Sequence, residues 1–332
     1  MRRYIIVLCS ALLLVACGKK TTREPVQHPA FCADSAFRFV AEQVHFGPRV
    51  PGSQAHTRCV IYMVNKLRSF GAEVTLQHGT KTNYAGEEQP IINVIGHFPG
   101  DSALEAVLLC AHYDSRPWCD EEEIYDNRFQ GVPAANDGAS GVGVLLEVAH
   151  QIGVARADTC RKSGKKMPID IVFFDCEDMG TPSFYTGPQR EHTWCLGSQL
   201  WAEQFAYGTD KPVSDKYEYG ILLDMVGAPN ATFPKEYYSM QAAGNYVEKI
   251  WRQANRLGYG KYFSSAAAYP IVDDHYYIAS IAGIPCVDII HYDAAGNTGF
   301  PSWWHTTQDN MRNIDKNTLG AVGETILSCL NY

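Results

Sequence analysis

The sequence lacks several motifs by which metal-binding and nucleic-acid-binding proteins are commonly recognised. None of its cysteines stands in a CxxC pair, which argues against a zinc site built from thiolates. The HExxH helix of many metalloproteases is also absent. There is no block of Lys and Arg, and the formal net charge is -8, so a nucleic-acid partner, which needs a basic stripe, is not expected. Peptides or small metabolites fit this composition better.

The apolar run at the amino end, residues 4–16, is too short to span a bilayer as a mature helix. Arg2 and Arg3 precede it directly, as in a secretory signal. We therefore expect residues 1–16 to be a signal peptide that directs export.

The end of this run, Leu-Val-Ala-Cys-Gly at 14–18, resembles a bacterial lipobox, in which Cys17 becomes the lipid-bearing first residue. An ordinary signal with a chance cysteine is the alternative. Residues 17–29, which contain several Lys, Thr and Pro, are expected to form a lipidated tether. The protein would then belong to the cell envelope, attached to the membrane by the lipid on Cys17 and facing the periplasm or the exterior.

The cysteine count argues for at least one free thiol. Eleven cysteines are present, and nine remain when Cys9 of the signal and Cys17 are set aside, an odd number in a compartment that permits disulfides. Cys110, Cys176 and Cys286 lie in apolar, strand-like runs and are expected to be small buried residues. No catalytic cysteine is expected.

Residues 30–332 are expected to form a single α/β domain, because neither an internal repeat nor a long linker interrupts them. The alternation of apolar runs and helical patterns predicts a central, mostly parallel mixed sheet flanked by helices. Buried strands are expected at 91–98, 106–112, 169–175, 220–226 and 285–290. Helices are expected at 53–70, 138–152, 196–205, 246–257 and 317–330.

Two irregular insertions, 116–133 and 179–195, lie between these elements, and long insertions usually carry function. The first contains the acidic run Asp-Glu-Glu-Glu at 120–123. We expect this run to be a solvated loop face, because it lacks the spaced oxygen ligands of a calcium site.

Polar side chains follow the expected strands, and in a parallel sheet such positions meet at one edge. They are His112, Asp114, Asp137, Glu177, Asp178, Asp224 and His305. Taken singly, each could be a helix cap or a hydrogen-bonded core group. Together, the acidic groups would repel one another unless a cation compensated them. Imidazole and carboxylate ligands without thiolate suit Zn²⁺ in a catalytic site.

The chain resembles the animal-type glutaminyl cyclases, which are themselves similar to zinc aminopeptidases, over nearly the whole mature sequence. The matching segments are HYDSR at 112–116, NDGAS at 136–140, FFDCED at 173–178, LLDMVGAPNATFP at 222–234, DDH at 273–275 and WWHTTQDN at 303–310. The first three are shared with the aminopeptidases. The last three, through GAPNATFP and DDH with WHT, point to the cyclases, and a zinc-aminopeptidase-like fold is implied.

The resemblance also implies roles for individual residues. One zinc ion per chain would be held by Asp137, Asp178 and His305. Glu177 would act as general base and acid, and Asp224 and Asp273 would be its catalytic partners outside the zinc ligands. An apolar pocket for the substrate glutamine would be lined by Met225, Ile271, Phe300 and Trp304.

Two positions depart from the family. Where the family has paired glutamates, this chain has Glu177-Asp178, so the shorter Asp178 must approach more closely to place an oxygen about 2.0–2.2 Å from zinc. The family also has a tryptophan shortly after the acidic pair. Here the candidates for that wall are Phe184, Tyr185 and Trp194.

The activity that the resemblance implies is that of a glutaminyl-peptide cyclotransferase, an acyltransferase. It would convert the N-terminal Gln of peptides or proteins to pyroglutamate and release ammonia. The main alternative is a zinc aminopeptidase, because His112 and Asp224 complete what resembles a two-metal ligand set. A lipoprotein that binds peptides or metal without catalysis is the third possibility.

Overall fold

The computed structural model describes residues 31–158, 166–207, 216–294, 296, 298–330 and 332. The expected signal peptide, residues 1–16, and the expected tether, residues 17–29 with Cys17, lie outside this part of the chain. Among the described residues, no helix combines the length and the apolar character needed to cross a membrane.

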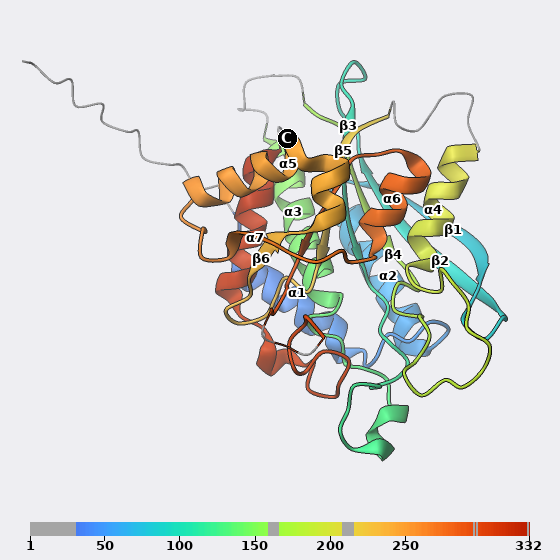
Figure 1. The fold of residues 1–332 in the computed structure, drawn as a ribbon. Helices are drawn as coiled ribbons and strands as arrows, with labels where there is room; N and C mark the ends of the chain where they lie inside the picture. Colours follow the sequence, from blue (N-terminus) through green and yellow to red (C-terminus); the bar gives the residue numbers. More distant parts are fainter. Residues whose placement is uncertain (1–30, 159–165, 208–215, 295, 297, 331) are drawn as a thin grey trace, which may run out of the picture.

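A six-stranded sheet forms the centre of the molecule, with the strand order β1-β2-β4-β3-β5-β8 (Figure 1). Its strands are β1 (Glu73–Thr82), β2 (Glu88–Phe98), β3 (Ala106–His112), β4 (Ile169–Phe174), β5 (Tyr217–Asp224) and β8 (Cys286–Ile290). The β1-β2 and β2-β4 pairs are antiparallel, whereas the β4-β3, β3-β5 and β5-β8 pairs are parallel. The expected mostly parallel mixed sheet is therefore confirmed.

Helices cover both faces of the sheet, so the central strands are largely apolar. Every residue of β3 is buried: Val107 and Leu109 pack on one face, and Leu108 and Cys110 on the other. The first face packs against α1 (Ala33–His45), α2 (Gln54–Ser69), α3 (Ala139–Ala157), α5 (Tyr237–Arg256) and α7 (Lys316–Cys329). The second packs against α4 (Leu196–Tyr207) and α6 (Asp274–Ala282).

Several elements were not expected from the sequence. They are α1, β1, α6, the two-stranded sheet of β6 (Phe233–Lys235) and β7 (Phe263–Ala267), and the 3-10 helices Tyr125–Phe129 and Met311–Asn313. In addition, α5 begins earlier than expected, because the Glu236 carboxylate accepts hydrogen bonds from the N–H groups of Tyr238 and Ser239 and so caps the helix.

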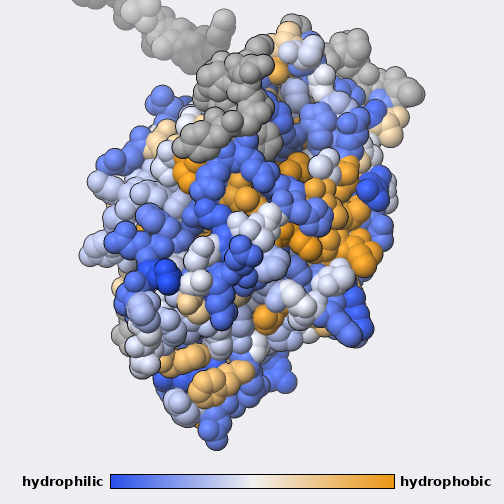
Figure 2. Space-filling view, turned by 90° about the vertical axis from the view of Figure 1, so that its right-hand side faces the viewer, coloured by the Kyte–Doolittle hydropathy of each residue, from blue (hydrophilic) through white to orange (hydrophobic). Residues whose placement is uncertain are grey.

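β1 escaped prediction because it is a largely polar edge strand, EVTLQHGTKT, that pairs only with β2. Figure 2 shows the side of the molecule on which β1 and α4 lie, and hydrophilic residues cover much of it around one larger apolar area. Hydrogen bonding to β2, not an apolar pattern, makes this segment a strand.

The cysteines behave as the sequence suggested. Cys110, Cys176 and Cys286 are fully buried. The eight cysteines among the described residues are all free thiols, so the prediction of at least one free thiol is confirmed.

Candidate active site

The site lies at the carboxyl edge of the sheet, where five chain segments deliver polar side chains. His112 ends β3, Asp224 ends β5, and the turn after β4 carries Glu177 and Asp178. Asp137 stands just before α3, and His305 enters from the loop after β8. The structure therefore brings together the residues that the sequence analysis selected.

Asp137 lies between two histidines. Its Oδ1 atom is 2.9 Å from His112 Nε2, and its Oδ2 atom is 3.5 Å from His305 Nε2. The next residue, Gly138, passes so close to His112 that a Cβ atom would lie 2.4 Å from the His112 carbonyl oxygen. Only glycine permits this approach, which explains the Asp-Gly pair.

Asp137, Asp178 and His305 present one group of potential metal ligands, with donor atoms all within 4.8 Å of one another. His305 Nε2 lies 3.1 Å from Asp178 Oδ1, so the shorter acid does reach the group. Both oxygens of Asp178 are buried, and neither has a hydrogen-bond partner among the described residues. Burial lowers the pKa of His305, but Asp178 and the other carboxylates raise it to about 10. This surplus of buried negative charge fits a divalent cation.

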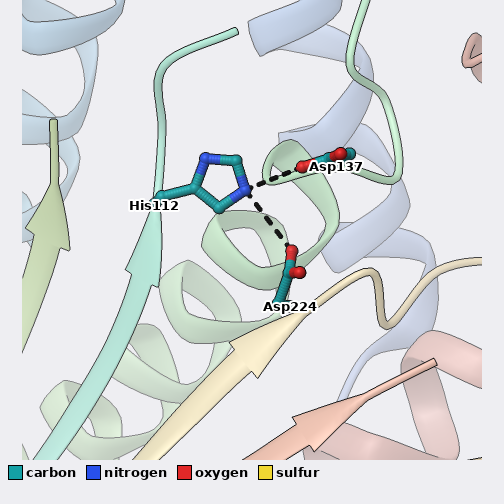
Figure 3. A group of neighbouring side chains, drawn as sticks. All are labelled: His112, Asp137 and Asp224. Carbon is teal, nitrogen blue, oxygen red and sulfur yellow. Dashed lines mark ion pairs between the residues drawn. The ribbon is translucent and has the colours of Figure 1, made fainter. Parts of the chain in front are cut away.

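A second group consists of His112, Asp137 and Asp224, drawn in Figure 3. Both carboxylates point at the same imidazole nitrogen, since Asp224 Oδ1 lies 3.3 Å from His112 Nε2. On the other side of the ring, His112 Nδ1 lies 3.4 Å from Asp114 Oδ1. Burial lowers the pKa of His112, but hydrogen bonds to these three carboxylates raise it well above its ordinary value.

Two further carboxylates hold the backbone that carries the ligands. The Asp114 carboxylate accepts hydrogen bonds from the N–H groups of Glu177 and Asp178, each at 3.1 Å. In the same way, Asp309 accepts from the N–H groups of Asn136 and Asp137, at 2.8 and 3.1 Å. The ligands are thus fixed through their main chain as well as through their side chains.

The chain turns sharply before the acidic pair, because Cys176 adopts a left-handed conformation with φ 54°. This turn directs Glu177 and Asp178 toward the same site. Burial raises the pKa of the Glu177 carboxyl well above its usual range, and burial likewise raises that of Asp273 to about 7. Glu177 and Asp273 lie in one group with Cys195, with polar atoms within 4.8 Å. A carboxyl of this kind is suited to carrying a proton.

A cavity of about 660 Å³ opens beside Glu177 and His305. Its lining includes the four residues that the resemblance implied, Met225, Ile271, Phe300 and Trp304. The Trp304 ring stacks on the His305 ring at 3.5 Å between centroids, and the Phe300 ring lies 4.8 Å from Trp304. The cavity is therefore an aromatic pocket that ends at the candidate metal ligands.

Of the three aromatic residues that the sequence offered for the far wall of the pocket, Trp194 is the one that forms it. It lines the cavity, and its ring lies parallel to His305, 6.1 Å away at 12°. The other two candidates are not among the residues that line the cavity. Phe184 packs against Trp118, and Tyr185 packs against Tyr84.

The prediction that residues 120–123 form a solvated loop face was wrong for Asp120, which is 4% exposed. Its two carboxylate oxygens accept hydrogen bonds from the Arg116 guanidinium at 2.6 Å each, and Oδ1 lies 3.5 Å from His305 Nδ1. The acid therefore supports the far side of the His305 ring. Glu122 also turns inward and accepts a hydrogen bond from the N–H group of Thr307.

The fold and the site together define an α/β enzyme with a candidate metal centre. The chain matches the model of peptidase family M28 over residues 93–330, and it belongs to this family.

Solved structures and a curated relative are similar to most of the chain. The glutaminyl cyclase of Tannerella forsythia is 47% identical, with a TM-score of 0.83 over 91% of this chain and 99% of that protein. A zinc-dependent exopeptidase from Parabacteroides distasonis gives the same identity and TM-score over 92% and 99%. The glutaminyl-peptide cyclotransferase of Bos taurus is 25% identical over 97% of this chain and 94% of its own length. The expected zinc-aminopeptidase-like fold is confirmed, since the chain shares the fold of the zinc-dependent exopeptidase and belongs to peptidase family M28.

Proposed function

We propose that the protein is a glutaminyl-peptide cyclotransferase, which converts the N-terminal Gln of peptides and proteins to pyroglutamate with release of ammonia. The observation that carries this proposal is the aromatic pocket that closes on Glu177 and on the ligand group around His305. The pocket suits one folded side chain better than a long polymer. The names of the similar proteins from Tannerella forsythia and Bos taurus support the same activity.

Asp137, Asp178 and His305 would hold one zinc ion, because their buried donor atoms converge and no described residue donates a hydrogen bond to the Asp178 carboxylate. When bound, zinc supplies a Lewis acid that polarises the side-chain amide carbonyl of the substrate Gln. His112 and Asp224 would stay outside this ligand set, where His112 contacts both Asp224 and Asp137 and so holds Asp137 from the other side.

Glu177 moves the proton in this reaction. It accepts a proton from the substrate α-amine, whose pKa is near 7.7–8.0 in free peptides, as the amine nitrogen forms its bond to the side-chain carbonyl carbon. It then returns the proton to the side-chain nitrogen, whose bond to that carbon breaks as ammonia leaves. Asp273, which belongs to the same group of polar side chains as Glu177, places a second carboxyl group at this end of the pocket.

The pocket supplies orientation. Met225, Ile271, Phe300 and Trp304 enclose the Gln side chain so that its amide faces its own α-amine. Holding the two groups together converts the reaction into a favourable intramolecular attack. No water molecule is needed as a nucleophile.

A zinc aminopeptidase is the second candidate, and the group of His112, Asp137 and Asp224 favours it. That group would complete a two-metal site of the kind that hydrolyses the first peptide bond. The similarity to the zinc-dependent exopeptidase of Parabacteroides distasonis also supports the aminopeptidase.

The protein is further proposed to act in the cell envelope, attached to a membrane through lipid on Cys17. The lipobox-like segment 14–18 and the short apolar run before it support this location. Its partners would then be exported peptides and proteins that begin with Gln.

The proposal is tested by removing and restoring the metal. Dialysis against a chelator should abolish release of ammonia from a Gln-initiated peptide, and one equivalent of zinc should restore it. Full ammonia release by protein that contains no zinc would contradict the proposed site.

A further inference from the structure

Cys195 lies against the turn that carries the proposed proton carrier, Glu177. It directly precedes α4, and it is fully buried. Its N–H group donates to the Glu177 carbonyl oxygen at 2.8 Å, and the N–H group of Leu196 donates to the Cys176 carbonyl oxygen at 3.0 Å. Two successive backbone hydrogen bonds therefore fix residue 195 beside Glu177.

The side chains of the same two residues are also joined. The Cys195 thiol donates to Glu177 Oε1, with 3.2 Å between sulfur and oxygen. In the part of the chain that the structure describes, no other side chain forms a hydrogen bond to the Glu177 carboxylate. The nearest basic group, His112 Nδ1, lies 4.0 Å from the other oxygen, Oε2. The thiol thus restrains one oxygen of a carboxylate whose side chain is 13% exposed and borders the cavity.

The sulfur acts as a donor here and not as a metal ligand. Burial and the nearby carboxylates of Glu177, Asp274 and Asp273 raise the pKa of the Cys195 thiol well above its ordinary value. The proton therefore stays on the sulfur, where it can be donated. A thiol is a weak hydrogen-bond donor, but it is small and uncharged. It therefore fits the buried space between the start of α4 and the Glu177 carboxylate.

We propose that Cys195 is a positioning residue for the reaction, whose thiol orients the Glu177 carboxylate toward the substrate amine. This inference rests on the proposed role of Glu177. The thiol leaves Oε2 free for proton transfer while it holds Oε1, and a carboxylate held in one orientation transfers protons faster than one that rotates.

Three substitutions distinguish the effect of losing the Cys195 thiol from the effect of disturbing the backbone at this residue. Cys195→Ala removes the donor, and Cys195→Ser keeps a donor of similar size. Cys195→Gly also removes the donor but suits the local backbone, since residue 195 has φ 56°, which glycine adopts without strain. Cys286→Ala, which removes a buried thiol of β8 far along the chain from Glu177, is the matched control.

With a Gln-initiated peptide as substrate, Cys195→Ala and Cys195→Gly should lower kcat by roughly 10-fold or more with little change in KM. Cys195→Ser should restore most of kcat, and Cys286→Ala should behave like the parent enzyme. Wild-type kcat in the Ala and Gly variants, or a Ser variant as slow as both, would overturn the proposal.

A double-mutant cycle then asks whether Cys195 acts through Glu177. In a Glu177→Gln background, Cys195→Gly should lower kcat no further, because the group that it orients is already gone. An equal loss in both backgrounds would show that the thiol acts elsewhere and would refute the inference. If Glu177→Gln alone keeps full activity, the proposed function of Glu177 fails, whatever the Cys195 variants do in the wild-type background.

Discussion

His112 Nε2 lies 2.9 Å from Asp137 Oδ1, and the other oxygen of the same carboxylate, Oδ2, faces His305. Asp137 therefore belongs to two possible metal groups at once. His112 Nε2 also lies 3.3 Å from Asp224 Oδ1, and Nδ1 of the same ring lies 3.4 Å from Asp114 Oδ1, so three carboxylates surround this imidazole. His112 would therefore join Asp137 and Asp224 from outside the group of Asp137, Asp178 and His305.

From this relationship we expect one tightly bound zinc ion per chain. Elemental analysis of the dialysed, active protein should give about one equivalent, in keeping with a single group of three protein ligands that leaves one position for the substrate. Two equivalents per active chain would place a second ion at His112 and Asp224 and would favour the aminopeptidase.

Substitutions of the adjacent acids Glu177 and Asp178 should have different effects, because Glu177 is proposed to transfer a proton and Asp178 to bind zinc. Glu177→Gln keeps the side-chain volume but removes the base, so the rate should fall roughly 10²- to 10⁴-fold with zinc still bound. Asp178→Asn should lose zinc instead, because a neutral amide is a poor substitute for a carboxylate ligand. His305→Ala should lose zinc in the same way. Zinc content after a chelator challenge, measured beside kcat, distinguishes the two effects.

The reverse pattern would exchange the two roles. A Glu177→Gln protein that is isolated without zinc, or an Asp178→Asn protein that retains full occupancy, cannot be reconciled with the ligand group around His305.

The sequence predicted most of the scaffold because the central strands are buried on both faces and read as apolar runs. β3 and β4 were found this way. α6 was missed because it is short and begins within the polar DDH segment, whose first residue, Asp273, caps the helix and belongs to the site. Local propensity carries little information where side chains are selected for chemistry.

The candidate ligands could be read from the sequence, but their supports could not. Asp120 belongs to an acidic run that is ordinarily solvated, and only the fold shows that Arg116 and His305 enclose it. Cys195 likewise looks like any buried cysteine until the turn at Cys176 brings Glu177 to its thiol. Apart from the Arg116–Asp120 pair, these contacts join residues from different segments of the chain, and no spacing rule encodes them.

Trp304 should contribute both to binding and to orientation, because it lines the pocket and stacks on His305. Trp304→Ala should raise KM and lower kcat for Gln-peptides, reducing kcat/KM by roughly 10-fold or more. Trp304→Phe keeps an aromatic plate and should lose less. Unchanged kinetics in the Ala variant would assign Trp304 to packing alone.

Cys17→Ala should release the protein from the membrane without altering catalysis, because no motif of the site lies near this residue in the sequence. Fractionation of expressing cells should move the variant from the membrane pellet to the soluble envelope fraction, with unchanged kcat on a Gln-peptide. Retention of the variant in the pellet would refute lipid attachment at Cys17.

The most direct measurement of the central claim is product analysis after purified, zinc-containing protein acts on a Gln-initiated peptide. We expect one equivalent of ammonia per peptide, with the peptide retaining all of its residues and losing its reactive α-amine. Release of free glutamine and a peptide shortened by its first residue would show hydrolysis and contradict the cyclotransferase.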